Sequence, residues 1–304
     1  MIKLVNDINE ANCITHAGNM HADDVFSTAF LELYQKNIYV FRTPNIPSTY
    51  EEKENVFIYD IGLGKYDHHQ TNARIRDDGI IYCSFGLLWE SYGKDFLEKE
   101  NYSNVEDLYQ AFIKDLVEAI DADDNGQFPK IDAPYKVKTL SDIIKLYNPK
   151  YGCTEDINDQ FLKAVEFAKT IIIEELYSLS GRIIAKKHVL ELLPQVKDHV
   201  LVLEEHMPYL EAVLEYDLKN KIYYAIFPSN RGGYMVKALQ KTLTDHTLRK
   251  PFPKEWCGLD EKDLERMTGI KDITFCHNGQ FLCATRTKEA AYLLATLASS
   301  YCQE

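Results

Sequence analysis

Apolar residues in the first 125 positions fall into short runs that alternate with one longer helical pattern. The runs at 12–16, 37–44 and 54–62 have the length and the β-branched or aromatic content of strands. Residues 22–35 repeat at helical spacing, which predicts a helix buried on one face. Its apolar positions are Val25, Phe26, Ala29, Phe30 and Leu33. This alternation predicts an α/β fold with a mostly parallel sheet covered on both sides.

The pattern changes twice in the rest of the chain. A helix is indicated near 105–122, and residues 126–190 have helical spacing almost throughout. Strand-like runs then return at 199–205, 221–230, 273–278 and 281–286, before a final helix at 287–301. We therefore predict an N-terminal domain (1–125), a helical connector or lid (126–190) and a smaller α/β domain (191–304), with ligands expected in the cleft between the two α/β domains.

The composition favours a folded cytoplasmic protein. Of the 304 residues 45% are hydrophobic, and no apolar stretch approaches the roughly 20 residues of a membrane helix. The first residues have the layout of neither a secretory signal nor a transit peptide. The seven cysteines include no C-x-x-C pair, so we expect reduced thiols rather than disulfides or a thiolate metal site.

The formal net charge of −13 argues against a protein that holds polyanions through a broad basic surface. If the substrate carries phosphates, other positive charges must offset theirs. Divalent cations would do so, and they would also neutralise clustered carboxylates.

Histidines and aspartates gather at four places, each at or near the expected end of a strand. They are His16, His21, Asp23 and Asp24; then Asp60; then Asp67, His68 and His69; and finally Asp121, Asp123 and Asp124. Because the carboxyl ends of parallel strands meet at one edge of a sheet, residues this far apart in sequence can converge.

Each cluster alone has an ordinary structural explanation. Asp23 and Asp24 suit a helix N-terminus, and Asp60 suits a turn before a glycine. Together, four clusters of His and Asp without Cys are better explained by a shared metal site. Mixed imidazole and carboxylate ligands suit Mn²⁺, Mg²⁺ or Fe²⁺, and are compatible with Co²⁺ or Zn²⁺. Their number suits two ions bridged by one carboxylate, an arrangement that activates water for displacement at phosphorus.

The motifs around these residues resemble those of a known group of enzymes. They are "THAGNMHADDV", "YDHHQ", "IDADDNG", "PFPKEWCGL" and "TGIKDITFCHNGQFLCATRTKEAA", which span nearly the whole chain. Asp-His-His behind a strand-end aspartate resembles the DHH phosphoesterase superfamily. Within it, the chain is similar to the Myg (melanocyte proliferating gene) family of metal-dependent hydrolases, which in eukaryotes are 3′–5′ RNA exonucleases. The resemblance implies that residues 1–125 form a DHH-like catalytic domain and that residues 191–304 bind substrate.

The resemblance also implies roles for individual residues. The metal ligands it implies are His16, His21, Asp23, Asp60 and His68, together with Asp121 or Asp124. Asp60 matches the bridging carboxylate, and Asp121 is slightly favoured over Asp124. The ions are expected to be two, most simply Mn²⁺.

Two neighbours of the ligands are expected to act in catalysis. His69 matches a group that contacts the scissile phosphate or donates a proton. Asp67 is expected to orient an imidazole as a hydrogen-bond acceptor.

Glycine-rich loops near the C-terminus stand where related proteins bind substrate. The expected contacts are Arg231, Gly232, Gly233, His277, Asn278 and Arg286. Hairpin turns with surface arginines are an equally simple explanation of these loops. The GGGH pattern of the superfamily is absent, which leaves the choice of substrate open.

These observations predict a metal-dependent phosphodiester hydrolase, an exonuclease of RNA or short oligonucleotides. One alternative is a phosphohydrolase of small molecules, such as pyrophosphate or a nucleotide-derived compound. The other is a metal-binding interaction module without catalysis. No membrane partner is expected, and a homodimer is compatible with the sequence.

Overall fold

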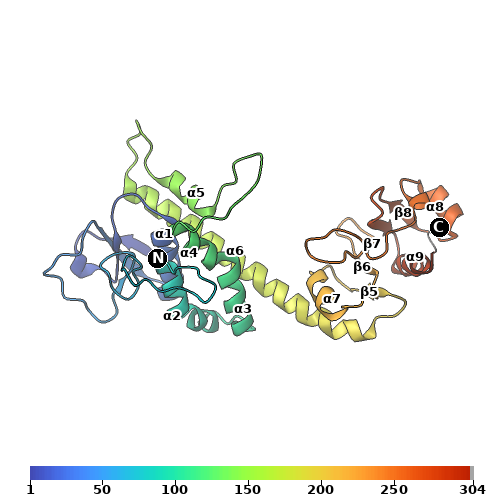
Figure 1. Cartoon of the computed structure of the whole chain (residues 1–304), viewed down its shortest axis with the longest axis horizontal. Coiled ribbons are helices and arrows are strands. Elements are labelled where there is room, and N and C mark those ends of the chain that lie inside the picture. The colour runs from blue at the N-terminus through green and yellow to red at the C-terminus, as the bar shows by residue number, and fades with distance from the viewer. Residues whose placement is uncertain (302–304) are drawn as a thin grey trace. The chain divides into compact units, whose positions relative to one another are not determined.

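The computed structural model describes residues 1–301, and the contacts within the chain divide it into two compact units, Met1–Ser180 and Gly181–Glu304 (Figure 1). Each unit has its own sheet, and the first is all parallel. The predicted α/β class is therefore confirmed. The boundaries predicted at 125 and 190 stay predictions. Among residues 1–301, no helix is both long and apolar enough to cross a membrane.

The first unit is built on four parallel strands in the order β1-β3-β2-β4. Their bounds are β1 Ile2–Leu4, β2 Cys13–His16, β3 Ile38–Thr43 and β4 Phe57–Ile58. A short 3-10 turn, η1 (Ile8–Glu10), lies between the first two. The central strand β2 pairs with β3 on one side and β4 on the other, and it ends at His16. The sheet thus delivers a histidine to the edge where the sequence predicts ligands.

Helix α1 (Ala22–Gln35) follows β2 and has the predicted bounds. Every residue from Ala22 to Glu32 is buried, including Asp23 and Asp24. The prediction of a helix buried on one face was therefore wrong, because α1 is covered on all sides over its first three turns. Two carboxylates are consequently held in the interior, where an unpaired charge is costly.

Further helices complete the first unit. They are α2 (Ser84–Lys99), α3 (Val105–Phe112), the π-helical turn η2 (Ile113–Val117), α4 (Glu118–Asp124), α5 (Leu140–Ile144), the 3-10 turn η3 (Lys145–Tyr147) and α6 (Ile157–Leu192), whose residues from Gly181 on belong to the second unit. Helix α2 packs against α1 through aromatic rings, with the Phe30 and Trp89 centroids 5.3 Å apart. The fourth predicted cluster lies at the end of α4, so its expected place after a strand was wrong.

The second unit has a mixed sheet of five strands in the order β5-β6-β7-β9-β8. Its elements are η4 (Leu193–Gln195), β5 (Val200–Val202), α7 (Leu210–Tyr216), β6 (Tyr224–Pro228), β7 (Tyr234–Ala238), η5 (Lys254–Trp256), α8 (Glu261–Thr268), β8 (Ile273–Cys276), β9 (Leu282–Thr285) and α9 (Lys288–Ser300). Alternate residues of its strands enter two separate apolar clusters, as Tyr224 and Ala225 do. Both faces of this sheet are therefore buried.

The six cysteines among the described residues are free thiols, as predicted. Cys302 lies outside the described residues.

Candidate metal centre

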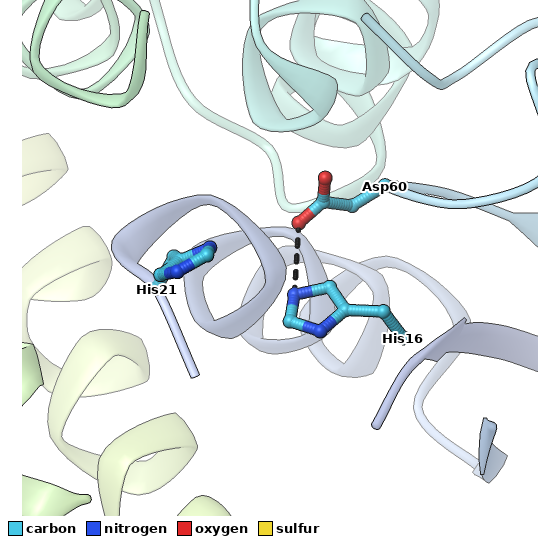
Figure 2. A group of neighbouring side chains, drawn as sticks. All are labelled: His16, His21 and Asp60. Atoms are coloured by element: carbon cyan, nitrogen blue, oxygen red, sulfur yellow. Dashed lines mark ion pairs between the residues drawn. The ribbon is translucent and has the colours of Figure 1, made fainter. Parts of the chain in front are cut away.

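The turn between β2 and α1 places two histidines beside the sheet edge (Figure 2). His21 is the N-cap residue of α1, and its backbone N–H donates to Asp24 Oδ1 at 2.7 Å. His16 Nδ1 lies 3.1 Å from the carbonyl oxygen of Ala17. A carbonyl only accepts, so it holds the proton on Nδ1 and leaves Nε2 as the nitrogen that can bind a cation.

Asp60 follows β4 and faces the histidines of two clusters. Its Oδ2 lies 3.2 Å from His16 Nε2, and its Oδ1 lies 3.5 Å from His68 Nε2. Its backbone has a φ of 55°, in the left-handed region that non-glycine residues seldom adopt, and its N–H donates to the carbonyl of Tyr66. The chain therefore holds an unusual conformation at the residue predicted to bridge.

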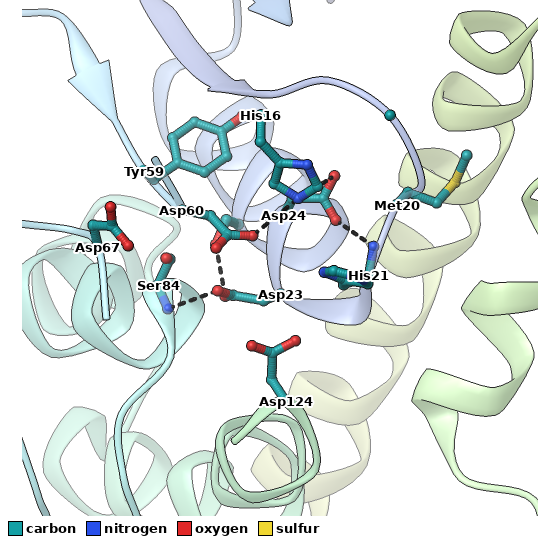
Figure 3. Close-up of polar contacts among 12 residues, drawn as sticks. His16, Met20, His21, Asp23, Asp24, Tyr59, Asp60, Asp67, Ser84 and Asp124 are labelled. Atoms are coloured by element: carbon teal, nitrogen blue, oxygen red, sulfur yellow. Dashed lines mark hydrogen bonds and ion pairs between the residues drawn. The ribbon is translucent and has the colours of Figure 1, made fainter. Parts of the chain in front are cut away.

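Asp23 is fixed by the start of helix α2. Its Oδ2 accepts the N–H of Ser84 at 2.9 Å, and its Oδ1 accepts the N–H of Phe85 at 2.6 Å. N–H groups at the start of a helix have no partner within the helix itself, and they favour a negative charge nearby. Figure 3 shows the carboxylates of Asp23, Asp60 and Asp124 around one space, and Asp23 Oδ2 lies 3.5 Å from His68 Nε2.

His68 is held between carboxylates on one side and an amide on the other. Its Nε2 lies 3.1 Å from Asp124 Oδ2, and its Nδ1 lies 3.2 Å from Asn125 Oδ1. The Asn125 Nδ2 donates to three backbone carbonyls, which fixes the amide so that its oxygen faces the imidazole. His68 therefore keeps its proton on Nδ1 and turns Nε2 toward the carboxylates, as metal-binding histidines do.

Asp67 orients the other histidine of the pair. Its buried carboxylate lies 2.6 Å from His69 Nδ1 and also accepts the N–H of Leu63. Because Nδ1 is engaged in this way, the Nε2 of His69 is the nitrogen that remains for another partner. The structure thus pairs Asp67 with His69 rather than with His68.

Of the two aspartates that fit the last ligand, the structure brings only Asp124 to the other ligands. The carboxylate of Asp121 accepts from Arg76 Nη2 at 2.5 Å and from the N–H of Cys83 at 3.0 Å. Within residues 1–301 Asp121 belongs to none of the groups that could hold an ion. The structure therefore favours Asp124 over the slightly preferred Asp121, because the charge of Asp121 is already paired with Arg76.

The centre carries more negative charge than its own side chains offset. Burial alone would lower the pKa of His68, but the carboxylates of Asp124, Asp60 and Asp23 outweigh it and raise the pKa to about 11. His16 behaves alike: Asp60 and Asp24 overcome burial and raise its pKa to about 9. Burial and the neighbouring aspartates raise the pKa of Asp23 well above its usual range. A cation would relieve this excess.

Several buried atoms of the centre have no hydrogen-bond partner within residues 1–301. They are His16 Nε2, Asp24 Oδ2, Asp60 Oδ2 and His68 Nε2. Buried polar atoms are nearly always paired, so four orphans in one place indicate a missing partner. The ligand atoms form three groups close enough to hold an ion: His16, His21 and Asp60; Asp60, His68 and His69; and Asp23, His68 and Asp124. The residues therefore fit divalent cations, and Asp60 is shared.

The centre opens to a cavity of about 450 Å³. His21, His68, His69 and Asp124 line it on the metal side. Phe128 and Lys145 also line it. A substrate in this cavity would lie against His69 and against three candidate metal ligands, His21, His68 and Asp124.

A family model described as an uncharacterised protein family (UPF0160), MYG1_exonuc, matches residues 12–298. The chain belongs to this family. Its relatives include a MYG1 protein of Dictyostelium discoideum, 26% identical over 95% of this chain and 96% of that protein. A MYG1 protein of Chlamydia trachomatis is 28% identical over 91% and 92%, and the MYG1 exonuclease of Homo sapiens is 24% identical over 92% and 84%. No solved structure gave a significant match.

The expected substrate residues of the second unit fall at two opposite ends of its sheet. Arg231, Gly232 and Gly233 form the turn between β6 and β7, and the pairing of Tyr234 with Thr285 brings Arg286 to the same end. His277 and Asn278 form the turn between β8 and β9, at the other end. These six residues therefore cannot contact one phosphate together.

Local contacts account for several of these residues. A Cβ on Gly233 would lie 2.2 Å from the carbonyl oxygen of Thr285, so packing requires glycine there. Arg286 forms two 2.7 Å bonds to Glu261, and His277 Nδ1 accepts the N–H of Gly279. Arg231 has no carboxylate partner in the described part of the chain, and it remains the best placed to bind an anion.

Sequence reasoning missed two residues that position the centre, Asn125 and Arg42, and gave no separate role to Asp24 of the first cluster. Asn125 fixes His68, and Asp24 lies 3.7 Å from His16 Nε2. Arg42, stacked 4.1 Å from the Phe161 ring centre, lies 3.8 Å from Asp24 Oδ2. Asn125 precedes a glycine, which suggested only a turn, and the position of Arg42 within strand β3 gave no signal of its target.

Proposed function

We propose that this protein is a metal-dependent phosphodiester hydrolase that removes nucleotides from an end of RNA or of short oligonucleotides. The observation that supports it most is the position of Asp60, whose carboxylate belongs to one ligand group with His16 and His21 and also lies 3.5 Å from His68 of another. The name exonuclease, carried by relatives in Homo sapiens and Mus musculus, adds independent support.

Two ions would be held by the residues already in place. His16, His21 and Asp60 would hold the first, and Asp23, His68 and Asp124 the second, with Asp60 beside His68 as the shared carboxylate. When bound, two divalent cations, most simply Mn²⁺, supply Lewis acidity that activates water and offsets charge on phosphoryl oxygens. Asn125 and the Ala17 carbonyl keep the two imidazoles in the required tautomer.

His69 is the group proposed to act on the substrate. Its side chain is 57% exposed and lines the cavity, whereas that of His68 is 7% exposed. Asp67 holds the proton on its Nδ1, so Nε2 is the nitrogen for the substrate, and in the imidazolium form it would donate a hydrogen bond or a proton to a phosphate or leaving-group oxygen. Within the second unit, Arg231 is proposed as a phosphate contact.

The test compares three substrates under one set of conditions. Mn²⁺-loaded protein is incubated with an end-labelled RNA oligomer, a DNA oligomer and pyrophosphate. We expect stepwise shortening of the RNA. Asp60→Asn should lower the rate by about 10²-fold or more, the scale of losing one preorganised electrostatic group. The exposed Asp77→Asn serves as the matched control and should keep the wild-type rate.

The outcomes separate the alternatives. An Asp60→Asn rate equal to that of the wild type would refute the mechanism. Turnover of pyrophosphate without RNA cleavage would favour a small-molecule phosphohydrolase, for which the net charge of −13 is the supporting observation. Bound metal without any hydrolysis would favour an interaction module.

A further inference from the structure

The segment that joins α4 to α5 is unusually apolar for a surface loop. Residues 127–138, "QFPKIDAPYKVK", form neither helix nor strand and are exposed apart from Ala133, and we call them the α4–α5 loop (Figure 1). The exposed fractions are 63% for Phe128, 53% for Ile131 and 71% for Tyr135. Aromatic side chains this exposed suggest a binding surface, because burial would otherwise stabilise them.

The same loop is basic in an acidic chain. Its charged residues are three lysines, Lys130, Lys136 and Lys138, and one aspartate, Asp132. None of the three lysines forms an ion pair within residues 1–301. By contrast, Lys114 of η2 forms ion pairs with both Asp78 and Glu118. The loop thus offers uncommitted positive charge.

Both ends of the loop are fastened beside the candidate metal centre. Gln127 binds the backbone of Ile81 and Gly79, and it directly follows the Asn125–Gly126 turn that orients His68. At the far end, Thr139 Oγ1 donates to Asp123 Oδ2 at 2.9 Å. Phe128 itself lines the cavity with His68 and His69. The loop therefore begins at the place where the proposed chemistry occurs.

Aromatic and basic side chains that lie in one exposed loop suit one class of ligand. A single-stranded nucleic acid offers unpaired bases that stack on aromatic rings and phosphates that attract lysines. A duplex hides its base faces, and a small phosphate would engage only the residues at the cavity.

We propose that the α4–α5 loop holds the single-stranded stretch of the substrate, with Phe128 and Tyr135 stacking on bases and the three lysines contacting phosphates. The inference rests on the proposed function of the metal centre. It adds that the substrate must be unpaired next to the end that is cleaved.

The test measures binding separately from cleavage. Asp60→Asn protein is titrated into a fluorescent single-stranded RNA 12-mer and into a blunt hairpin of the same composition. In that background, Phe128→Ala/Tyr135→Ala should weaken single-strand binding by about 10-fold or more. Lys130→Gln/Lys136→Gln/Lys138→Gln should lower the slope of log Kd against log salt by about 2, at about 0.7 for each phosphate that a lysine no longer neutralises. The parent Asp60→Asn protein should bind the hairpin more weakly than the single strand, and the loop variants should lose most of this difference.

Matched controls lie in the first unit outside the loop. Tyr151→Ala removes a fully exposed tyrosine, and Lys163→Gln removes an exposed lysine of α6. Both should leave the Kd for the single strand unchanged, and thermal melting should show all variants folded, since the loop side chains are on the surface.

Each possible result bears on either the loop proposal or the proposed function. Loop variants that bind the single strand as tightly as the parent Asp60→Asn protein, or a parent protein that binds hairpin and single strand alike, would overturn the proposal while leaving the metal chemistry untouched. A change of oligomeric state in the loop variants, with RNA binding intact, would show instead that the loop docks protein. Loop-dependent binding by a protein whose wild type cleaves no RNA would overturn the proposed function and leave the loop's role standing.

Discussion

His68 and His69 are adjacent in the chain, yet they meet different surroundings. The imidazole of His68 is enclosed by Asp23, Asp60 and Asp124, whereas that of His69 is held by Asp67 and faces the cavity. A buried nitrogen among three carboxylates suits a cation, and an exposed nitrogen with a carboxylate behind it suits proton transfer. Two residues of one type therefore have two expected roles.

Replacing each histidine separately tests this division. His68→Ala should lower Mn²⁺ affinity by at least about 10-fold. Losing a residue that merely supports a metal ligand already costs about 10-fold or more, and losing a ligand should cost no less. His69→Ala should keep the bound Mn²⁺ and lower turnover by about 10²- to 10⁴-fold, as loss of a general acid does. Metal content by elemental analysis and turnover are measured on the same samples, and equal loss of metal in both variants would contradict the division.

Metal binding should release protons. Without metal, carboxylates raise the pKa of His16 to about 9 and of His68 to about 11, so both are protonated at pH 7. A ligand imidazole must be neutral, so protons compete with the ion and the affinity for Mn²⁺ should rise as the pH increases from 6 toward 9. Titration calorimetry in buffers of different ionisation enthalpy measures the protons released. An affinity that is flat or falls over this range would argue against these histidines as ligands.

Much of the candidate centre could be predicted from residue types and spacing. His16, His21, Asp60 and His68 were expected to converge, and the fold brings them together. Asp121 and Asp124 are one helical turn apart, so spacing could not separate them. The choice depends on Arg76, which comes from a loop 45 positions away and pairs with Asp121.

At the level of elements, Asp121 fastens α4 to the start of α2. It accepts the N–H of Cys83, and its carboxylate lies over Gly86 of α2. A Cβ on Gly86 would lie 2.3 Å from Asp121 Oδ1. Because Arg76 holds this carboxylate from the other side, it cannot easily move away.

Gly86→Ala should therefore destabilise the protein despite the better helix propensity of alanine. The expected loss is about 1–3 kcal/mol in the free energy of unfolding, the usual cost of overpacking. Gly181→Ala in α6 is the control: it meets no atom within 4 Å and should gain up to about 1 kcal/mol. Urea unfolding followed by circular dichroism measures both, and a Gly86→Ala variant as stable as Gly181→Ala would show that Asp121 is free to move.

Element types were more predictable than their extents. The helix over 22–35 has the expected bounds, and the final helix expected at 287–301 is present as α9, with Thr287 as its N-cap. Strand β4 covers only two residues of the run at 54–62, because the chain turns away at Asp60 with a positive φ. Strand β7 was missed, since its run is interrupted by Lys237 and follows two glycines that suggested a turn.

For the molecule as a whole, charge and family agree with a metal-dependent hydrolase. With a net charge of −13, the chain as a whole would repel a phosphate-bearing substrate. The buried carboxylates in the first unit are suited to bind divalent ions, which would offset this repulsion. The family match covers residues of both units, so the second unit is part of what the family has in common. The role of the second unit in binding substrate could not be predicted, because a single sequence does not specify which groups surround its glycine-rich loops.

The central claim is a pair of ions that share Asp60. Crystals grown with Mn²⁺ and measured at the manganese absorption edge test it most directly. Two anomalous peaks should lie in the first unit, one contacting His16, His21 and Asp60, the other contacting Asp23, His68 and Asp124, with Asp60 touching both. A single peak, or peaks held by other residues such as Asp121, would contradict the account.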